Sequence, residues 1–275
     1  MRVESVLTGR HNQVVISAHL HERHDSNVDI TGDVERKFIA GSVAKLYLAS
    51  AAFAISQEGG FNLEERKHIT LSDFAKGNYG TGELRFTNFP LALGLRLLRA
   101  AQEQPVTFRP VSNRRLLELM VSKSDNLATL VVVNTLGREL IQQVLTFWGM
   151  KETSLYNPQT GSKNQTTAED VGRFLRKLSS GSLVPQNEAE VIKKWMTSKF
   201  KKNAELQPIT LRYKDGRISE DGRSFYHKVG FIEGTLGEDI FVILTEGIAA
   251  ERGRIPFSQE MKVQEIQELI IRRTP

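Results

Sequence analysis

The spacing of apolar and polar residues changes twice along the chain. A β-branched run at 14–20 predicts a strand, and a second short strand is predicted at 28–30, after the polar turn at 25–27. From Ser42 onward, apolar residues recur at helical spacing until Glu58-Gly59-Gly60 ends the run. The pattern therefore predicts a strand pair and then a helix that begins at or next to Ser42.

The middle of the chain is patterned as helix almost throughout, with Gly, Pro, Asn and Ser clusters between the segments. Helices are predicted at 91–101, 114–121, 126–136, 139–148, 168–178 and 188–197. After this section, apolar and polar residues alternate with a period of two, which predicts strands at 225–231 and 239–245 with a turn near 234–237. An amphipathic helix is predicted to follow at 258–272.

Strands near both termini imply that the two ends of the chain share one sheet, into which a helical subdomain is inserted. We therefore expect a discontinuous sheet subdomain formed by 1–41 and 205–275, and a helical subdomain formed by 42–204.

The composition is that of an ordinary soluble globular chain, with 275 residues, 40% hydrophobic and 25% charged. The absence of cysteine excludes disulfides, thiolate metal sites and cysteine nucleophiles. A net charge of +5 favours anionic partners without requiring nucleic acid. No apolar stretch approaches the roughly 20 residues of a membrane helix, and the first residues lack a secretory pattern, which fits a cytoplasmic protein or one whose leader has been removed.

The first chemical motif is Ser42-Val43-Ala44-Lys45, which places a hydroxyl and an amine on one face of a helix start. A lysine with a lowered pKa can take the serine proton, and the helix N-terminus offers backbone N–H groups to a developing oxyanion. The alternative is a capping serine beside a solvated lysine.

Two further motifs follow in order. Ser124-Asp125-Asn126 opens a helix, where Ser124 can pass a proton and Asn126 can offer its amide, although these residue types are also favoured helix caps. Lys228-Val229-Gly230 lies on a strand, where Lys228 can attract a substrate carboxylate or be an ordinary edge-strand lysine.

The order SxxK, SDN and a KTG-like triplet resembles the signature of class A β-lactamases and penicillin-binding proteins. The flanking residues at 38–41, 166–170 and 238–243 also resemble that family, so the resemblance covers nearly the whole chain. It implies an α/β (α+β), β-lactamase/transpeptidase-like fold, in which helices flank an antiparallel sheet and an all-helical subdomain is inserted.

The resemblance also implies roles for particular residues. Ser42 would be the acylated nucleophile, Lys45 its proton acceptor and Ser124 the relay to the leaving nitrogen. The substrate would be bound by the residues Asn126, Lys228, Gly230 and Phe231. The oxyanion hole would consist of the backbone N–H groups of Ser42 and of Phe231, the residue after the triplet glycine.

The sequence departs from the family pattern at two places. Val229 replaces the usual hydroxyl residue of the triplet, and a lost hydrogen bond to a charged group costs roughly 10- to 100-fold in binding or turnover. The stretch 153–167 contains no carboxylate to serve as the Ω-loop glutamate that activates the deacylating water, which leaves Glu152 and Glu233 as open candidates. The segment 149–158 is more similar to D-alanyl-D-alanine carboxypeptidases.

Weaker signals favour simple explanations. His19, His21 and His24 could form a metal site, but no matching set of ligands lies nearby. His227 either lines the site and tunes Lys228 or has no role. A basic run around Trp195 and Phe200 could attract nucleic acid, a membrane surface or an anionic polymer, although a solvated helix end is the better interpretation. Its members are Lys193, Lys194, Lys199, Lys201 and Lys202.

The leading hypothesis is a β-lactamase-like serine hydrolase that forms an acyl-enzyme at Ser42 and deacylates slowly. The alternatives are a D,D-peptidase and a non-catalytic penicillin-binding or sensor protein. We expect no cofactor and no metal, a β-lactam or a D-Ala-type cell-wall peptide as ligand, no nucleic acid and no membrane span. The resemblance implies an extracytoplasmic location.

Overall fold

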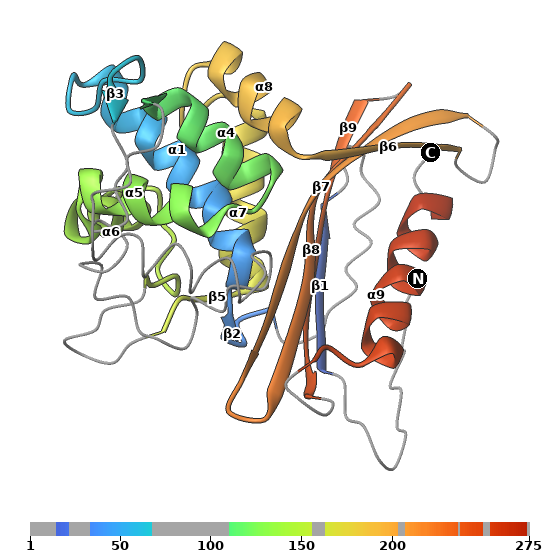
Figure 1. The fold of residues 1–275 in the computed structure, drawn as a ribbon. Helices are drawn as coiled ribbons and strands as arrows, with labels where there is room; N and C mark the ends of the chain where they lie inside the picture. The colour runs from blue at the N-terminus through green and yellow to red at the C-terminus, as the bar shows by residue number, and fades with distance from the viewer. Residues whose placement is uncertain are drawn as a thin grey trace.

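The computed structural model describes residues 15–21, 34–67, 110–155, 163–202, 207–235, 237–249 and 254–273. A block of helices lies against one face of an antiparallel sheet, and the C-terminal helix covers the other face (Figure 1). The strand predicted at 28–30, the helix predicted at 91–101 and His24 lie outside the described residues.

The sheet has the order β1-β9-β8-β7-β6, and each neighbouring pair is antiparallel. Its strands are β1 (Val15–His21), β6 (Thr197–Lys202), β7 (Pro208–Glu220), β8 (Arg223–Gly234) and β9 (Gly237–Ile248). Because β1 pairs with β9, the N-terminal strand lies in the same sheet as the C-terminal strands, as the pattern predicts.

Two strands of the five-stranded sheet, β6 and β7, are not predicted by the sequence pattern. Asp215-Gly216 is a typical turn dipeptide but lies inside β7, whereas the turn to β8 is formed by Asp221 and Gly222, at φ 51° and 73°. The predicted helix at 188–197 also ran too far, because the helix ends at Trp195 and the chain is extended at Met196 (ψ 157°). Residues 197–202 therefore extend the sheet from within the segment assigned to the helical subdomain.

The helical block contains one short 3-10 helix and several α-helices. Its helices are η1 (Gly41–Val43), α1 (Ala44–Gln57), α4 (Asn113–Ser122), α5 (Asn126–Leu136), α6 (Arg138–Phe147), α7 (Ala168–Ser179) and α8 (Gln186–Trp195). Two short strand pairs accompany them: β2 (Phe38–Ile39) with β5 (Gln165–Thr166), and β3 (Arg66–Lys67) with β4 (Val111–Ser112).

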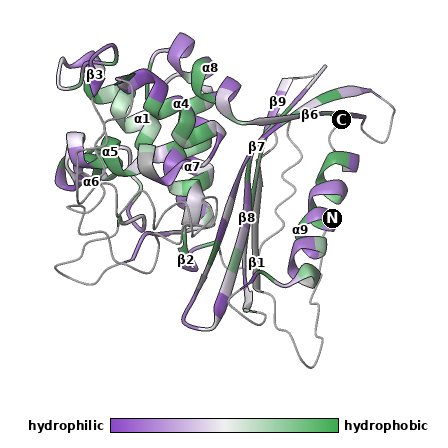
Figure 2. Ribbon diagram, in the orientation of Figure 1, coloured by the Kyte–Doolittle hydropathy of each residue, from purple (hydrophilic) through white to green (hydrophobic). Residues whose placement is uncertain are grey.

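Helix α1 is the centre of the block. Residues 44–53 are all buried, which is unusual for a helix and fits its alanine-rich sequence, because small side chains let neighbouring helices approach from every side. Much of α1 has apolar colouring (Figure 2), and its buried residues form the main core together with Phe225, Val229 and Phe231 of the sheet. The helix that begins at the Ser42 motif is therefore held from all directions.

A second, smaller core lies on the opposite face of the sheet, under α9 (Phe257–Arg273). Val263 and Ile270 of α9 pack there against Leu211, Tyr226 and Ile243 of the sheet. Alternate residues of β7 and β8 thus face either the helical block or α9, and this alternation decides which side chains can reach the site.

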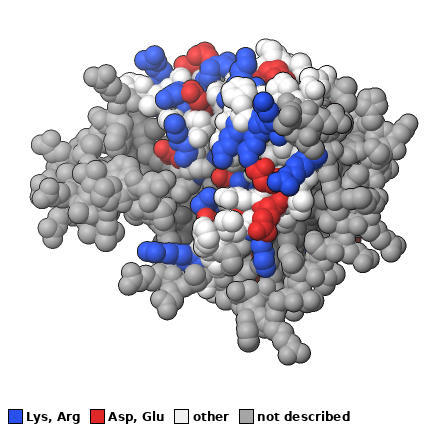
Figure 3. Space-filling model, turned by 90° about the vertical axis from the view of Figure 1, so that its right-hand side faces the viewer, with Lys and Arg blue, Asp and Glu red and all other residues white. Residues whose placement is uncertain are grey.

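The basic run around Trp195 is not simply a solvated helix end, because Lys193 is only 3% exposed. Its ammonium group pairs with Glu238 of β9 at 2.8 Å and with Glu190 at 3.1 Å. Lys201 pairs with Glu268 of α9. On the face that carries α9, basic side chains are interspersed with acidic ones (Figure 3), which does not support a nucleic-acid surface there.

Removing one partner of the Lys193–Glu238 pair is expected to destabilise the protein strongly. The variant Lys193→Met leaves Glu238 largely buried without its cation, which costs about 3–5 kcal/mol in the free energy of unfolding, measured by urea denaturation. The double variant Lys193→Met/Glu238→Met should recover most of that loss. A single variant within about 1 kcal/mol of wild type would contradict this prediction.

Candidate active site

Ser42 lies on the short turn η1, next to the edge of β7. Gly41 adopts φ +51°, and an ideal Cβ placed on it would lie 3.5 Å from the backbone nitrogen of Arg217. Glycine therefore permits both the turn and its close approach to β7. Because η1 leads directly into α1, Lys45 follows Ser42 by about one helical turn and faces the same side of the helix.

Lys45 joins the Ser42 motif to the Ser124 motif. Its Nζ is buried and donates to the backbone oxygen of Ser124 and to Oδ1 of Asn126, both at 2.6 Å. Two of the motifs found in the sequence, 81 residues apart, are therefore in direct contact. Asp125 between them does serve as a helix cap, since its Oδ1 accepts from the Ala128 N–H at 2.9 Å.

Ser124 has a left-handed backbone, at φ 53°, which is uncommon for a residue other than glycine. Such strain costs of order 1–3 kcal/mol and persists where the surroundings fix it. Here those surroundings include two lysines: Lys45 binds the Ser124 carbonyl, and Lys214 of β7 donates to the Ser124 hydroxyl oxygen. Because that oxygen accepts from Lys214, the Ser124 O–H remains able to donate elsewhere.

Lys214 is a further residue at this junction, which the sequence motifs did not indicate. Its Nζ also donates to the Val121 carbonyl at 2.6 Å, and burial lowers its pKa to about 8, opposed by the nearby carboxylate of Asp215. Lys214-Asp215-Gly216 has the Lys-x-Gly spacing of a KTG-like triplet and lies on a strand. This spacing is the sequence signal that could have identified Lys214. The Asp215-Gly216 pair, which is typical of a turn, instead argued against a strand at this position.

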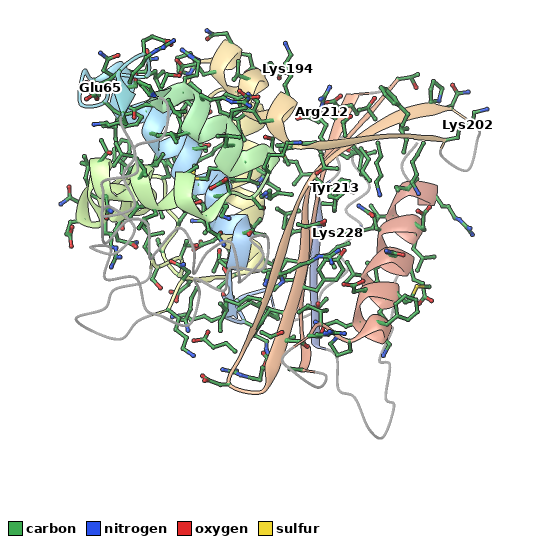
Figure 4. All side chains as sticks on the ribbon, in the orientation of Figure 1. Glu65, Lys194, Lys202, Arg212, Tyr213 and Lys228 are labelled. Atoms are coloured by element: carbon green, nitrogen blue, oxygen red, sulfur yellow. The ribbon has the colours of Figure 1, made fainter. Side chains whose placement is uncertain are left out.

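The prediction that Lys228 belongs to this site is wrong. Lys228 pairs across the sheet with Asp215 and lies on the α9 face, whereas Lys214 pairs with Val229 on the opposite face. The Lys228 Nζ donates to Oε1 of Gln267 in α9 at 3.1 Å and lies 5.1 Å from the ring centre of Tyr213 (Figure 4). Val229 therefore faces the helical block, but its triplet, Lys228-Val229-Gly230, is not the one whose lysine reaches Ser124.

The predicted roles of Gly230 and Phe231 do not fit the structure either, for a different reason. Both lie on β8, an inner strand, and Phe231 pairs with Arg212 on one side and with Ile240 on the other. Its backbone groups are therefore engaged in the sheet. Gly230 instead allows close strand packing, since an ideal Cβ there would lie 1.9 Å from the Arg212 carbonyl oxygen.

The backbone of β7 offers a replacement for the predicted oxyanion donor. Strand β6 pairs with β7 only as far as Tyr213, so in the described part of the chain residues 214–220 form the edge of the sheet beside η1. Arg217 follows the triplet glycine there, and its nitrogen lies next to Gly41. This nitrogen thus lies beside the turn that carries Ser42.

The candidate deacylation carboxylates are engaged by other partners. Glu152 pairs with Lys37 at 2.8 Å, and Glu233 pairs with Arg212 at 2.5 Å. Asp170, which is 3% exposed, accepts from Thr153 Oγ1 at 2.8 Å and from the Glu152 N–H at 2.9 Å, so it supports the segment after α6.

The described segments offer neither a metal cluster nor a membrane span. No group of three His, Cys, Asp or Glu residues gathers within them as a metal site. His19 and His21 lie on β1. Nor does any described helix combine the length and apolar content that crossing a membrane requires.

A helical block on one face of an antiparallel sheet, with an SxxK serine at their junction, defines a protein with the class A β-lactamase fold. The chain belongs to the β-lactamase enzyme family, whose model matches residues 2–254. No curated protein sequence matches the chain.

Solved structures agree on the fold. A point mutant of PBP-A, described as an acyl-enzyme complex with penicillin G, is 18% identical with a TM-score of 0.66, over 95% of this chain and 90% of that one. A class A β-lactamase from Bacteroides cellulosilyticus is 18% identical with a TM-score of 0.64, covering 94% and 91%. An ancestral class A β-lactamase is 13% identical with a TM-score of 0.67, covering 96% and 95%.

Proposed function

We propose that the protein is a serine hydrolase that is acylated at Ser42 by β-lactams or related amides and esters. The observation that carries this proposal is the convergence of Lys45 and Lys214 on Ser124, which joins α1, the start of α5 and β7 at one point. A capping serine beside a solvated lysine would not require either lysine to be buried, and both are.

In the proposed acylation step, Lys45 takes the Ser42 proton as the Ser42 oxygen attacks the carbonyl carbon. The backbone N–H groups of Ser42 and Arg217 stabilise the oxyanion. The C–N bond breaks as Ser124 donates its proton to the leaving nitrogen, and the proton held by Lys45 restores the Ser124 hydroxyl. Lys214 provides positive charge beside Ser124, and Asn126 positions Lys45.

We expect deacylation to be slow. The stretch 153–167 contains no carboxylate, and Glu152 and Glu233 are paired with basic residues. The middle residue of the Lys214 triplet is Asp215, where the family has a hydroxyl residue. A substrate carboxylate therefore has no hydroxyl donor at that position and depends on the charge of Lys214. The same features favour the second candidate, a D-alanyl-D-alanine carboxypeptidase-like or non-catalytic penicillin-binding protein, and an extracytoplasmic location fits either.

Two parallel incubations distinguish these functions. The protein is mixed with a labelled penicillin and, separately, with a chromogenic cephalosporin, and both covalent mass and colour are followed. We expect a lasting adduct on Ser42 with little colour, because the acyl-enzyme forms and persists. Rapid colour without an adduct would establish efficient hydrolysis and contradict slow deacylation. The absence of both would refute acylation by β-lactams.

The acylation rate is expected to fall as the pH rises through about 8, the pKa to which burial lowers Lys214. Above that pH, Lys214 loses the charge that binds the substrate and polarises Ser124. The rate of adduct formation between pH 6 and 10 measures this effect. The variant Lys214→Arg should acylate without this falling limb, because arginine stays charged. A wild-type rate that rises steadily to pH 10 would contradict the assignment.

A further inference from the structure

His227 is completely buried in β8, and its described neighbours hold it by both ring nitrogens. Nε2 lies 2.8 Å from the backbone oxygen of Ile39, and Nδ1 accepts from the N–H of Thr245 in β9 at 3.2 Å. Because Nδ1 accepts, the proton must reside on Nε2, which donates to Ile39. The ring is therefore neutral, and burial lowers its pKa to about 4.

The sheet is altered locally to form this contact. The register between β8 and β9 runs from Phe225 opposite Glu246 to Lys228 opposite Ile243, and the ladder pairing skips the two positions between. There the Thr245 N–H binds the His227 ring, and the Thr245 hydroxyl binds the Tyr226 carbonyl. A side chain has thus replaced a backbone acceptor in the middle of a sheet, where ladder bonds are the rule.

The ring also lies where the two parts of the proposed oxyanion hole approach each other. Ile39 is three residues before Ser42, and Gly216 pairs with His227 immediately before Arg217. An ideal Cβ on Gly216 would lie 3.2 Å from Cδ2 of His227 and 3.1 Å from the Ala40 carbonyl. His227 thus contacts the strand that leads to the nucleophile and, on β7, the triplet glycine.

We propose that His227 is a positioning residue, which holds the Ser42 turn at the correct distance from the Arg217 edge through its bond to the Ile39 carbonyl. This proposal rests on the proposed function, because the distance matters to the extent that an oxyanion forms between the two backbone nitrogens. It also replaces both sequence-based interpretations of His227, since the ring faces away from Lys228 and has two partners.

Two amide variants separate the two bonds of the ring. His227→Gln places an N–H donor near the position of Nε2 and keeps the bond to Ile39, whereas His227→Asn places an acceptor near Nδ1 and cannot reach Ile39. We expect the first-order acylation rate to fall by roughly 10-fold in His227→Asn and by less than about 3-fold in His227→Gln, with the noncovalent binding constant unchanged in both.

A control variant accounts for general loss of stability. Gln259→Leu removes buried hydrogen bonds to Ser224 and Thr245 from the α9 side, so it should lower the melting temperature while leaving acylation unchanged. Equal acylation in His227→Asn and wild type would overturn the proposal. A rate loss that follows the melting temperature equally across all three variants would overturn it as well.

A readout that does not need acylation separates this proposal from the proposed function. If wild type forms no adduct with penicillin, the proposed function fails, and NMR still tests the position of the turn. The His227 ring should show the Nε2–H tautomer at pH 7. The backbone amide signals of Ser42 and Arg217 should shift in His227→Asn and stay in place in His227→Gln, and equal shifts in both variants would overturn the proposal.

Discussion

The variant Ser42→Ala is expected to form no covalent adduct with penicillin, and its rate of reaction should fall by at least about 10⁴-fold, since removal of a catalytic nucleophile has effects of this size. The hydroxyl oxygen of Ser42 is the attacking atom in the proposed mechanism, and η1 carries no other hydroxyl or amine that could replace it. Intact-mass measurement after incubation with penicillin tests this result. Folding should be preserved, because alanine fits a short helical turn.

A second serine on the same helix provides the control. Ser50 lies in α1, is fully buried, and its hydroxyl has no hydrogen-bond partner among the described residues. Ser50→Ala should therefore leave adduct formation unchanged. An adduct that persists in Ser42→Ala would show that the acylated residue lies elsewhere.

The variant Lys214→Met is expected to slow acylation by about 10²- to 10³-fold, which lies in the lower part of the roughly 10²- to 10⁴-fold that a group assisting proton transfer contributes. Lys214 donates to the Ser124 hydroxyl, and methionine has similar length without the charge. The paired variant Lys228→Met should change the acylation rate by less than about 3-fold, because Lys228 is bonded to Gln267 on the opposite face of the sheet.

The two lysine variants test two Lys-x-Gly triplets on the adjacent strands β7 and β8. The triplet whose lysine variant loses acylation is the one that belongs to the active site. Acylation rates are measured at a temperature at which circular dichroism shows both variants folded. A large loss in Lys228→Met together with a small loss in Lys214→Met would refute the assignment of the site to β7.

The sequence predicted the elements whose signals are local. The helix at 126–136 has the predicted bounds, because Asp125 caps it and apolar residues recur along it until Gly137. The Ser42 and Ser124 motifs each stand at the start of a helix, as the sequence predicts, because each motif is contiguous in the chain. That Lys45 reaches the second motif could be expected from the resemblance but not from spacing, because it depends on how α1 packs against α4 and α5.

The error at Lys228 has a physical cause. In a strand, a shift of one residue moves a side chain to the other face, and sequence alone did not show which face of β8 meets the helices. Lys228-Val229-Gly230 lies on β8, an inner strand, whereas the triplet that we propose as functional, Lys214-Asp215-Gly216, lies on β7, whose residues 214–220 form an edge. An edge leaves backbone N–H groups available, which a site of this kind needs.

The contacts of Ser124 also link chemistry to the assembly of the molecule. Lys45 reaches this serine from within the helical block, and Lys214 reaches it from the sheet. If the sheet separates from the helical block, the hydrogen bond between Lys214 and Ser124 must break, and the strained backbone of Ser124 can then relax. If penicillin labels Ser42 as proposed, labelling will also report whether the sheet and the helical block are docked. In mild denaturant we expect labelling to be lost when that interface first opens, while the circular dichroism signal of the helices is still intact.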